Sequence, residues 1–299
     1  MKPIKATHLP LALLLALAGA PGAGRAAEAP RVDSITWLSA DPPAAADERP
    51  SGGLADRLVG FVANQWPAPR HQIVQANPKR SWQKLLDGEP VCLVSVVRTP
   101  EREKQAYFTN TQIGPPLQLI VRREKLAALP RNAAGEVLLA RLLADERLRG
   151  ALVEGRSYGS HIDAQLAQRP AQNRSISFYA ANDFGSKMLP MLDIGRADYT
   201  IEYAISLNAG RAQPHPQFEE LAAVPIQGAE PMQAGVACPR TPWGLEAIRG
   251  IDRVLGTPAG AQMLRELNER WASGGDPRQH LGARADAFYK ERAKPSQIR

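Results

Sequence analysis

Strand-like and helical patterns of apolar residues alternate in the first part of the chain. Residues 34–38, 71–76 and 91–97 predict strands, and the near-continuous apolar run at 91–97 is typical of a strand that is covered on both faces. Residues 54–62 and 81–86 repeat their apolar side chains at helical spacing. The order strand, helix, strand, helix, strand predicts an α/β fold with a parallel sheet.

A second block of the same kind begins at residue 117. Its predicted strands are 117–122, 151–153, 175–179 and 199–201, and its predicted helices are 136–143, 160–167 and 184–192. Beyond a Pro-rich loop, strands at 222–226 and 235–238 precede helices at 243–255 and 259–271. These last elements hold too few strands for a third domain. We therefore expect them to pack on an earlier lobe, with the chain crossing between lobes more than once.

The first 26 residues have a different pattern. Lys2 and Lys5 precede an apolar stretch at 9–20, and small residues stand at the −3 and −1 positions of a cleavage site after Ala26. We expect a signal peptide at 1–26, since this apolar stretch is too short to span a bilayer. The alternative, a buried helix, is disfavoured by the glycines and the proline that follow. With no Cys near the cleavage point, the mature chain is expected in the periplasm without a lipid anchor.

Composition then narrows the class of protein. The 299 residues suit one large or two ordinary domains, and 44% apolar with 22% charged residues is typical of a folded globular protein. Loss of Lys2, Lys5 and Arg25 with the signal peptide lowers the formal net charge from +7 to +4. The remaining basic residues are scattered among acids, so we expect no nucleic-acid partner and interpret the basic run at 292–299 as a solvated tail.

Cysteine and histidine usage argues against a metal centre. The histidines lie far apart and no Cys-x-x-Cys spacing occurs, so we predict no metal site and no cofactor. Cys92 and Cys238 are the two cysteines of the chain. In an oxidising compartment a disulfide between them is the natural expectation, with two buried thiols as the alternative.

The segment after the predicted strand at 91–97 carries the first candidate binding residues. Ligands of open α/β sheets lie beyond the carboxyl ends of the strands. Thr99 and Pro100 form a helix start there, with Arg102 in the first turn and Ser95 on the preceding strand. Helix starts attract anions, and a guanidinium binds a carboxylate through two points, so we predict an anion site. The alternative is that Arg102 is an ordinary surface residue.

A similar arrangement follows the predicted strand at 151–153. The loop after it contains Ser157 and Tyr158, and Ser160 with Asp163 has the spacing of a capping box at a helix N-terminus. Ordinary capping explains Ser160 and Asp163 without any ligand, and this alternative stays open. If both helix starts bind, one from each lobe faces a shared cleft.

Several short segments resemble, in their order along the chain, the bacterial extracellular solute-binding proteins of family 3, which have the type II periplasmic binding fold. The segments are 53–58 (GLADRL), 82–88 (WQKLLDG), 99–102 (TPER), 117–122 (LQLIVR) and 195–198 (GRAD). The resemblance extends over nearly the whole mature chain. Residues 89–92 (EPVC), 157–159 (SYG) and 201–203 (IEY) look like a subgroup of stand-alone periplasmic members whose ligands are generally unassigned.

This resemblance implies an α/β protein of two lobes that are joined by two hinge strands, at 117–122 and 232–236. The implied division is 1–26 signal peptide, 27–121 first lobe, 122–234 second lobe, 235–285 return to the first lobe and 286–299 tail. In this fold the strand with Cys92 lies antiparallel to the return strand with Cys238, within disulfide range.

The resemblance also implies roles for individual residues. Arg102 matches the arginine that takes the α-carboxylate of an amino-acid ligand, with help from Ser95 and Ser160. The full predicted ligand set is Ser95, Thr99, Arg102, Ser157, Tyr158, Ser160, Glu202 and Tyr203.

Two departures count against a standard polar amino acid as the ligand. Tyr203 stands where family members carry an Asp for the α-ammonium group, and Glu202 beside it is expected to point to the other face of an extended segment. The aromatic residue that stacks on the ligand is also missing, because Pro43 is followed by alanines.

The function implied is a non-enzymatic binding protein, a monomer that closes on a small anionic or zwitterionic solute for an ABC transporter or a sensor kinase. An enzyme is the first alternative: Ser95 or Ser157 would need a histidine base, which no nearby motif supplies, and Glu154 or Glu202 lacks a partner carboxylate. The second alternative is a degenerate binding fold that acts as a periplasmic interaction or signalling module.

Overall fold

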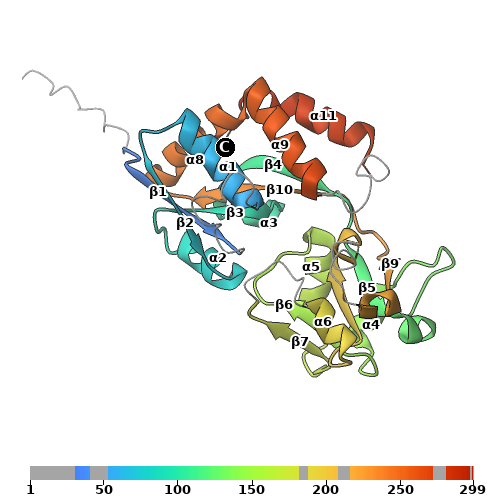
Figure 1. Ribbon diagram of the computed structural model, residues 1–299. Helices are drawn as coiled ribbons and strands as arrows, with labels where there is room; N and C mark the ends of the chain where they lie inside the picture. Colours follow the sequence, from blue (N-terminus) through green and yellow to red (C-terminus); the bar gives the residue numbers. More distant parts are fainter. Residues whose placement is uncertain are drawn as a thin grey trace, which may run out of the picture.

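Two lobes, each built on its own β-sheet, make up the computed structural model (Figure 1). The structure describes residues 31–40, 53–181, 188–207, 216–271, 281–296 and 298. The expected signal peptide and the alanines after Pro43 lie outside these residues. Within the described parts of the chain each sheet has five strands.

The first lobe has the strand order β2-β1-β3-β10-β4. Its strands are β1 (Ser34–Ser39), β2 (Arg70–Gln75), β3 (Val91–Val97), β4 (Ala106–Gly114) and β10 (Met232–Pro239). β1, β2 and β3 are parallel, which confirms the expectation from the apolar pattern, and β10 runs antiparallel between β3 and β4. The pattern predicts the return strand β10, whereas it misses β4 at the sheet edge.

Successive side chains of β1 and β3 point to opposite faces of this sheet, and helices cover both faces. One face carries α1 (Leu54–Gln65), α8 (Pro242–Leu255) and α9 (Pro258–Trp271), and α11 (Ala283–Arg292) packs on α9 (Figure 1). The other face carries α2 (Pro78–Leu86). Among the described helices, none combines the length and the apolar character that crossing a membrane requires.

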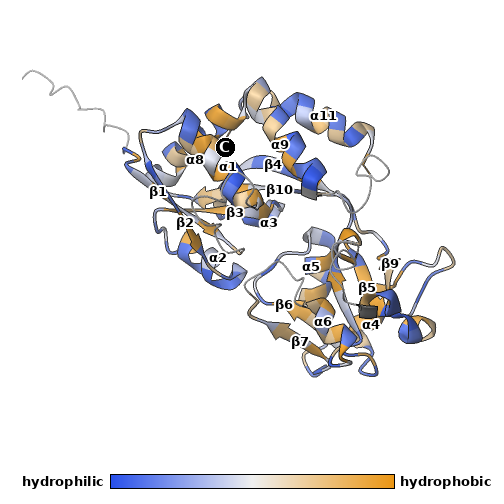
Figure 2. Cartoon of the chain, in the orientation of Figure 1, coloured by the Kyte–Doolittle hydropathy of each residue, from blue (hydrophilic) through white to orange (hydrophobic). Residues whose placement is uncertain are grey.

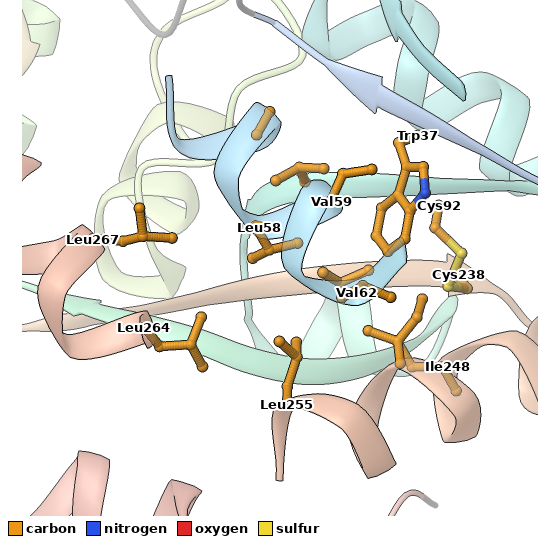
Figure 3. Packing of buried hydrophobic residues seen from close by; sticks show 14 of the residues in the cluster. Trp37, Leu58, Val59, Val62, Cys92, Cys238, Ile248, Leu255, Leu264 and Leu267 are labelled. Atoms are coloured by element: carbon orange, nitrogen blue, oxygen red, sulfur yellow. A yellow bond between two sulfur atoms is a disulfide. The ribbon is translucent and has the colours of Figure 1, made fainter. Parts of the chain in front are cut away.

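The core of the first lobe centres on the buried Trp37 of β1. Figure 3 shows Val62 of α1 and Ile248 of α8 next to each other on one side of it, with Leu58 of α1 and the bond between Cys92 and Cys238 nearby. Each of these aliphatic side chains is fully buried, which stabilises the lobe by about 1.5–3 kcal/mol per side chain. On the opposite face α2 buries Leu85 against neighbouring strands.

The second lobe has the strand order β7-β6-β8-β5-β9. Its strands are β5 (Gln118–Arg122), β6 (Gly150–Val153), β7 (Ile176–Tyr179), β8 (Tyr199–Glu202) and β9 (Leu221–Pro225), and its helices are α4 (Leu139–Ala144), α5 (Ser160–Ala167) and α6 (Met188–Asp193). Strands β6 and β7 are largely hydrophobic (Figure 2). α4 begins later than the expected residue 136, because Val137 forms β-bridges with Arg131 and Ile226.

The chain crosses between the lobes twice among the described residues. The first crossing, at 115–117, joins β4 to β5, and the second, at 226–231, joins β9 to β10. The crossings lead directly into the two strands that the family resemblance implies as hinges. The last helices therefore return to the first lobe, as the sequence predicts.

A disulfide joins Cys92 of β3 to Cys238 of β10. These strands are antiparallel neighbours, as the resemblance implies, and the two Cα atoms lie 4.4 Å apart. The cysteines are 146 positions apart in the sequence, so in the chain-entropy model the bond stabilises the fold by up to about 5 kcal/mol. It links the first half of the chain to the returning segment within one sheet.

The interpretation of residues 292–299 as a solvated tail is wrong for Arg292, whereas Lys294, Pro295 and Ser296 are exposed. Arg292, the last residue of α11, is buried, and its guanidinium donates hydrogen bonds to Asp252, Thr109 and the carbonyl of Asn110. The basic residue is buried because it has a carboxylate partner in α8, which sequence spacing does not reveal.

Candidate ligand-binding cleft

A cleft of about 260 Å³ lies between the two lobes. The first lobe contributes side chains of β1, α2 and β3 and the segment after β3, and the second lobe contributes the loop after β6 and the end of β8. These are the carboxyl ends of parallel strands, where ligand sites of open α/β sheets are found. The polar lining residues are Ser81, Ser95, Arg102, Gln112, Arg156, Ser157, Glu202, Tyr203 and Ser206.

Arg102 lies in the cleft and not in bulk solvent. Its guanidinium carbon is 4.5 Å from the centre of the Trp82 ring, a cation–π arrangement. Nη1 donates to the carbonyl of Val97, at 3.3 Å, and Nη2 donates to the carbonyl of Gly155 in the second lobe, at 3.2 Å. These bonds use two of the five N–H donors of the guanidinium. Among the described residues no carboxylate forms an ion pair with it.

The surroundings of Arg102 change its acidity in a defined way. Burial lowers the pKa of Arg102 to about 10, and the nearby carboxylate of Asp163 opposes that shift. The group stays positively charged at neutral pH, so it presents a partly desolvated cation to the cleft. Such a cation gains more from an anionic ligand than an exposed one does.

The helix that carries Arg102 is a single turn, α3 (Pro100–Glu103). Thr99 caps it as predicted, since its Oγ1 accepts a hydrogen bond from the Arg102 amide at 3.2 Å. The anion site expected at this helix start stays a prediction, and a single turn adds little helix dipole to it. Any anion binding here depends on the guanidinium.

Ser95 reaches the cleft through an irregularity of β3. Its φ is +59°, in the left-handed region that serine rarely adopts. Gly235 of β10 pairs with Val96, and Ala237, two positions further, pairs with Leu93, which is three positions away from Val96 on β3. β3 therefore holds one extra residue at this point, a β-bulge. The bulge breaks the side-chain alternation at the point where the strand meets the cleft.

The floor of the second lobe carries a buried ion pair between Arg156 and Glu202. Their side chains are 6% and 5% exposed. Nη1 of Arg156 donates to Oε2 of Glu202 at 2.5 Å, and Nη2 donates to Oε1 at 3.0 Å. Burial lowers the pKa of Arg156, but the charge and hydrogen bond of Glu202, together with Tyr158 and Tyr203, outweigh it, so the pKa is raised overall. Both residues line the cleft as a paired, locally neutral unit.

Glu202 and Tyr203 do not point to opposite faces with respect to the cleft, since both line it. The expected alternation holds inside a strand, and β8 ends at Glu202. Tyr203 also contacts the hinge region, because its ring is the nearest neighbour of Gly114 at the end of β4. Burial raises the pKa of the Tyr203 hydroxyl, which therefore stays protonated.

The predicted capping box of Ser160 and Asp163 is wrong. The N-cap of α5 is Gly159, with φ +89°, and Asp163 accepts hydrogen bonds from the Ser157 hydroxyl at 2.5 Å and the Tyr158 amide at 2.7 Å. Of these residues only Ser157 is among those lining the cleft. Tyr158 packs in the core of the second lobe, with its hydroxyl accepting from the Val153 amide.

Ser160 lies beside the cleft, where the two lobes touch. Its hydroxyl is 3.4 Å from a carboxylate oxygen of Glu101 in the first lobe. Nearby, Lys79 of α2 forms an ion pair of 2.7 Å with Glu154. Gly155 comes so close that a Cβ on it would lie 2.5 Å from the Cα of Lys79. The lobes therefore meet at one edge of the cleft through polar side chains and the backbone of Gly155.

Sequence reasoning did not select several residues that line the cleft, among them Trp82, Gln112 and Arg156. From the sequence, Trp82 is expected to be a core residue of an amphipathic helix. Arg156 had a usable signal, since it lies in the loop after β6, at the carboxyl end of a parallel strand. The described residues contain no group of His, Cys, Asp or Glu side chains that would hold a metal ion.

No protein-family model and no curated protein sequence matches the chain. Solved structures do match it. The amino acid ABC transporter substrate-binding protein AbpA from Streptococcus pneumoniae Canada MDR_19A, bound to L-arginine, is 14% identical with a TM-score of 0.56, over 81% of this chain and 94% of that one. A putative L-cystine ABC transporter from Listeria monocytogenes is 16% identical with a TM-score of 0.57, over 80% and 94%.

A third similar structure is a histidine kinase sensor domain with similarity to periplasmic binding proteins. It is 14% identical with a TM-score of 0.56, over 80% of this chain and 95% of that domain. At such identities the likeness shows the fold. The two-lobe type II periplasmic binding fold expected from the sequence is confirmed.

Proposed function

We propose that the protein is a periplasmic solute-binding protein, a monomer that closes on a small anionic or zwitterionic, amino-acid-like solute and presents it to an ABC transporter or a sensor. The observation that carries the proposal is the position of Arg102: a partly desolvated guanidinium, stacked on Trp82, inside a cleft formed by both lobes. Ligand contacts from both lobes form together in the closed state, so binding shifts the equilibrium toward closure.

Two further features support binding rather than catalysis. Ser157 donates its hydroxyl to Asp163, and no histidine of the described residues lines the cleft, so neither Ser157 nor Ser95 has a base that would make it a nucleophile. Glu202 is held by Arg156 and is not poised as a general acid. The similar solved structures are named for substrate binding, transport or sensing.

Substitution of Arg102 by alanine tests this function. A thermal-shift screen of the purified mature protein with amino acids, 2-oxo acids, dicarboxylates and short peptides identifies a ligand, and calorimetry then measures its Kd. We expect Arg102→Ala to weaken binding by at least about 30-fold, or about 2 kcal/mol, because the ligand carboxylate loses its charged partner in a desolvated cleft.

Lys104→Ala is the matched control. It removes one positive charge from the cap of the same short helix, but Lys104 is exposed and lies outside the cleft. Its Kd should equal that of the unmodified protein. An unchanged Kd in Arg102→Ala contradicts the proposed role of the guanidinium. If no compound of the panel shifts the melting temperature, the result favours the degenerate interaction module instead.

A further inference from the structure

The charges that line the cleft do not suit an amino acid. Among the described lining residues the side chains that are charged at neutral pH are those of Arg102, Arg156 and Glu202. Arg156 and Glu202 neutralise each other, which leaves the net positive charge of Arg102. An α-amino acid carries a carboxylate and an ammonium group, so its second charge needs a negatively charged partner in the cleft.

Both carboxylate oxygens of Glu202 accept hydrogen bonds from its own protein. Oε1 accepts from Nη2 of Arg156 at 3.0 Å and from the Tyr203 amide at 2.8 Å, and Oε2 accepts from Nη1 of Arg156 at 2.5 Å. A ligand ammonium group that approached Glu202 would also approach the Arg156 guanidinium, a like charge. Displacing Arg156 would leave a buried cation without its partner, which is strongly unfavourable.

The other carboxylates near the cleft are also occupied. Asp163 accepts from Ser157 and Tyr158, Glu154 pairs with Lys79, and Glu101 lies against Ser160. None of these three carboxylates is among the residues that line the cleft. Within the described residues, no carboxylate is therefore placed to pair with an α-ammonium group, and the buried Oε1 of Gln112, which has no hydrogen-bond partner, offers a neutral amide oxygen instead.

The rest of the lining is apolar. Leu38, Leu54, Leu93, Val94 and Val96 belong to it, together with the ring of Trp82. The space of about 260 Å³ fits a small molecule, and such walls favour a hydrocarbon or aromatic body next to the carboxylate that Arg102 receives.

We infer that the cleft selects an apolar monocarboxylate that has no α-ammonium group, such as a branched or aromatic 2-oxo acid. The inference rests on the proposed function and specifies its ligand class. Arg102 pairs with the carboxylate, the Arg156–Glu202 pair blocks the place of a cation, and the apolar wall takes the body. Rejection of the amino acid follows because its ammonium group would be desolvated with no carboxylate partner among the described lining residues.

Matched ligand pairs test the inference on the unmodified mature protein. 4-Methyl-2-oxopentanoate is compared with L-leucine, and phenylpyruvate with L-phenylalanine, by calorimetry at pH 7.5. The members of each pair share a body and a carboxylate and differ at the α-carbon. We expect at least one oxo acid to bind ten-fold or more tightly than its amino acid, a difference of about 1.4 kcal/mol. Equal or tighter binding of the amino acids overturns the inference.

The variant Arg156→Met tests the blocking role directly. Removing the guanidinium leaves Glu202 able to receive an ammonium group, so the ratio of the amino-acid Kd to the oxo-acid Kd should fall at least ten-fold relative to the unmodified protein. Arg149→Met is the matched control, because Arg149 pairs with the buried Asp198 of the same lobe, away from the cleft. An unchanged ratio in a folded Arg156→Met protein overturns the blocking role.

The outcomes separate this inference from the function on which it rests. If an amino acid binds best and Arg102→Ala abolishes that binding, the solute-binding function stands and the ligand class is wrong. If no compound of the wider panel binds, both fall together. Should Arg156→Met not fold, the comparison of ligand pairs on the unmodified protein still decides the ligand class.

Discussion

The two arginines that line the cleft differ in what compensates their charge. Arg102 donates to the carbonyl groups of Val97 and Gly155, whereas Arg156 is held in two-point fashion by Glu202. A carbonyl dipole compensates a cation less than a carboxylate does, so Arg102 is the residue with affinity left for an anion. The difference between a binding group and a structural group therefore lies in the partner, not in the residue type.

His71 of β2 provides a prediction at the same scale. Nε1 of Trp37 donates to its Nδ1 at 3.1 Å, so Nδ1 is unprotonated and Nε2 donates to the carbonyl of Trp66 at 3.0 Å. Burial lowers the pKa of His71 below its ordinary value of 6.5, with the Trp66 carbonyl opposing the shift. Protonation of Nδ1 would break the hydrogen bond from Trp37 in the core.

Because the folded protein holds this histidine neutral, its contribution to stability is complete above pH 6.5 and is lost as the pH falls toward the lowered pKa. We expect the free energy of unfolding to fall between pH 7.5 and 5.5, by at most about 1.4 kcal/mol per pH unit for this one proton. Urea unfolding of His71→Gln at the same pH values should give a flatter dependence. Identical slopes for the two proteins would rule out His71 as the source.

At the scale of elements, the bulge in β3 and the last helix, α11, each fix the position of neighbouring parts of the first lobe. The bulge at Ser95 turns the end of β3 toward the cleft. At the other end of the chain α11 closes the first lobe, and Arg292 ties it to α8 through Asp252 and to β4 through Thr109. Both side chains of the Arg292–Asp252 pair are 3% exposed, so α11 is part of the lobe's core.

This pair predicts a large effect of Arg292→Ala. Burial lowers the pKa of Arg292 and Asp252 opposes that shift, which marks a desolvated pair. Removing the guanidinium leaves Asp252 buried with a lost partner, so we expect the free energy of unfolding in urea to fall by about 3–5 kcal/mol. Arg284→Ala, at an exposed position of the same helix, should change it by less than about 0.5 kcal/mol. Equal, small effects of the two substitutions would show that the Arg292–Asp252 pair contributes little to the free energy of unfolding.

At the scale of the whole molecule, two compact lobes are joined by the crossings at 115–117 and 226–231 and touch at one edge of the cleft. Gly155 is the closest backbone approach described there, and its φ of +77° lies in the left-handed region that favours glycine. The residue thus allows the loop after β6 to meet α2 and its carbonyl to reach Arg102. We therefore predict that closure of the lobes on a ligand involves this small surface.

Gly155→Ala is expected to weaken ligand binding by at least about ten-fold, because the added Cβ would lie 2.5 Å from the Cα of Lys79 and hold the lobes apart. Calorimetry with the ligand found in the screen measures the Kd, and small-angle scattering measures the separation of the lobes. The control is Gly135→Ala, which has a similar φ of +82° but nothing within 4 Å of the added Cβ. Equal Kd values for the two variants would exclude a role of this contact in closure.

Local patterns in the sequence determined much of the framework. Apolar periodicity predicts β1, α1, β2, α2 and β3 nearly to their ends, because each of these elements buries one face or both. The cap at Thr99 was also predictable, since capping involves a hydrogen bond between near neighbours. The family resemblance added the two-lobe fold and the strand pairing that joins Cys92 to Cys238.

Tertiary structure alone decided the rest. β4 contains the polar residues Asn110, Thr111 and Gln112, and its pairing with β10 shifts at Thr111. The alternation of apolar and polar residues therefore does not predict this strand. The Arg156–Glu202 pair joins residues 46 positions apart, and Arg292 meets a carboxylate 40 positions away. A sequence states which charges a chain carries. Which of them are neutralised depends on contacts between distant elements, and those contacts decide which charge the cleft presents.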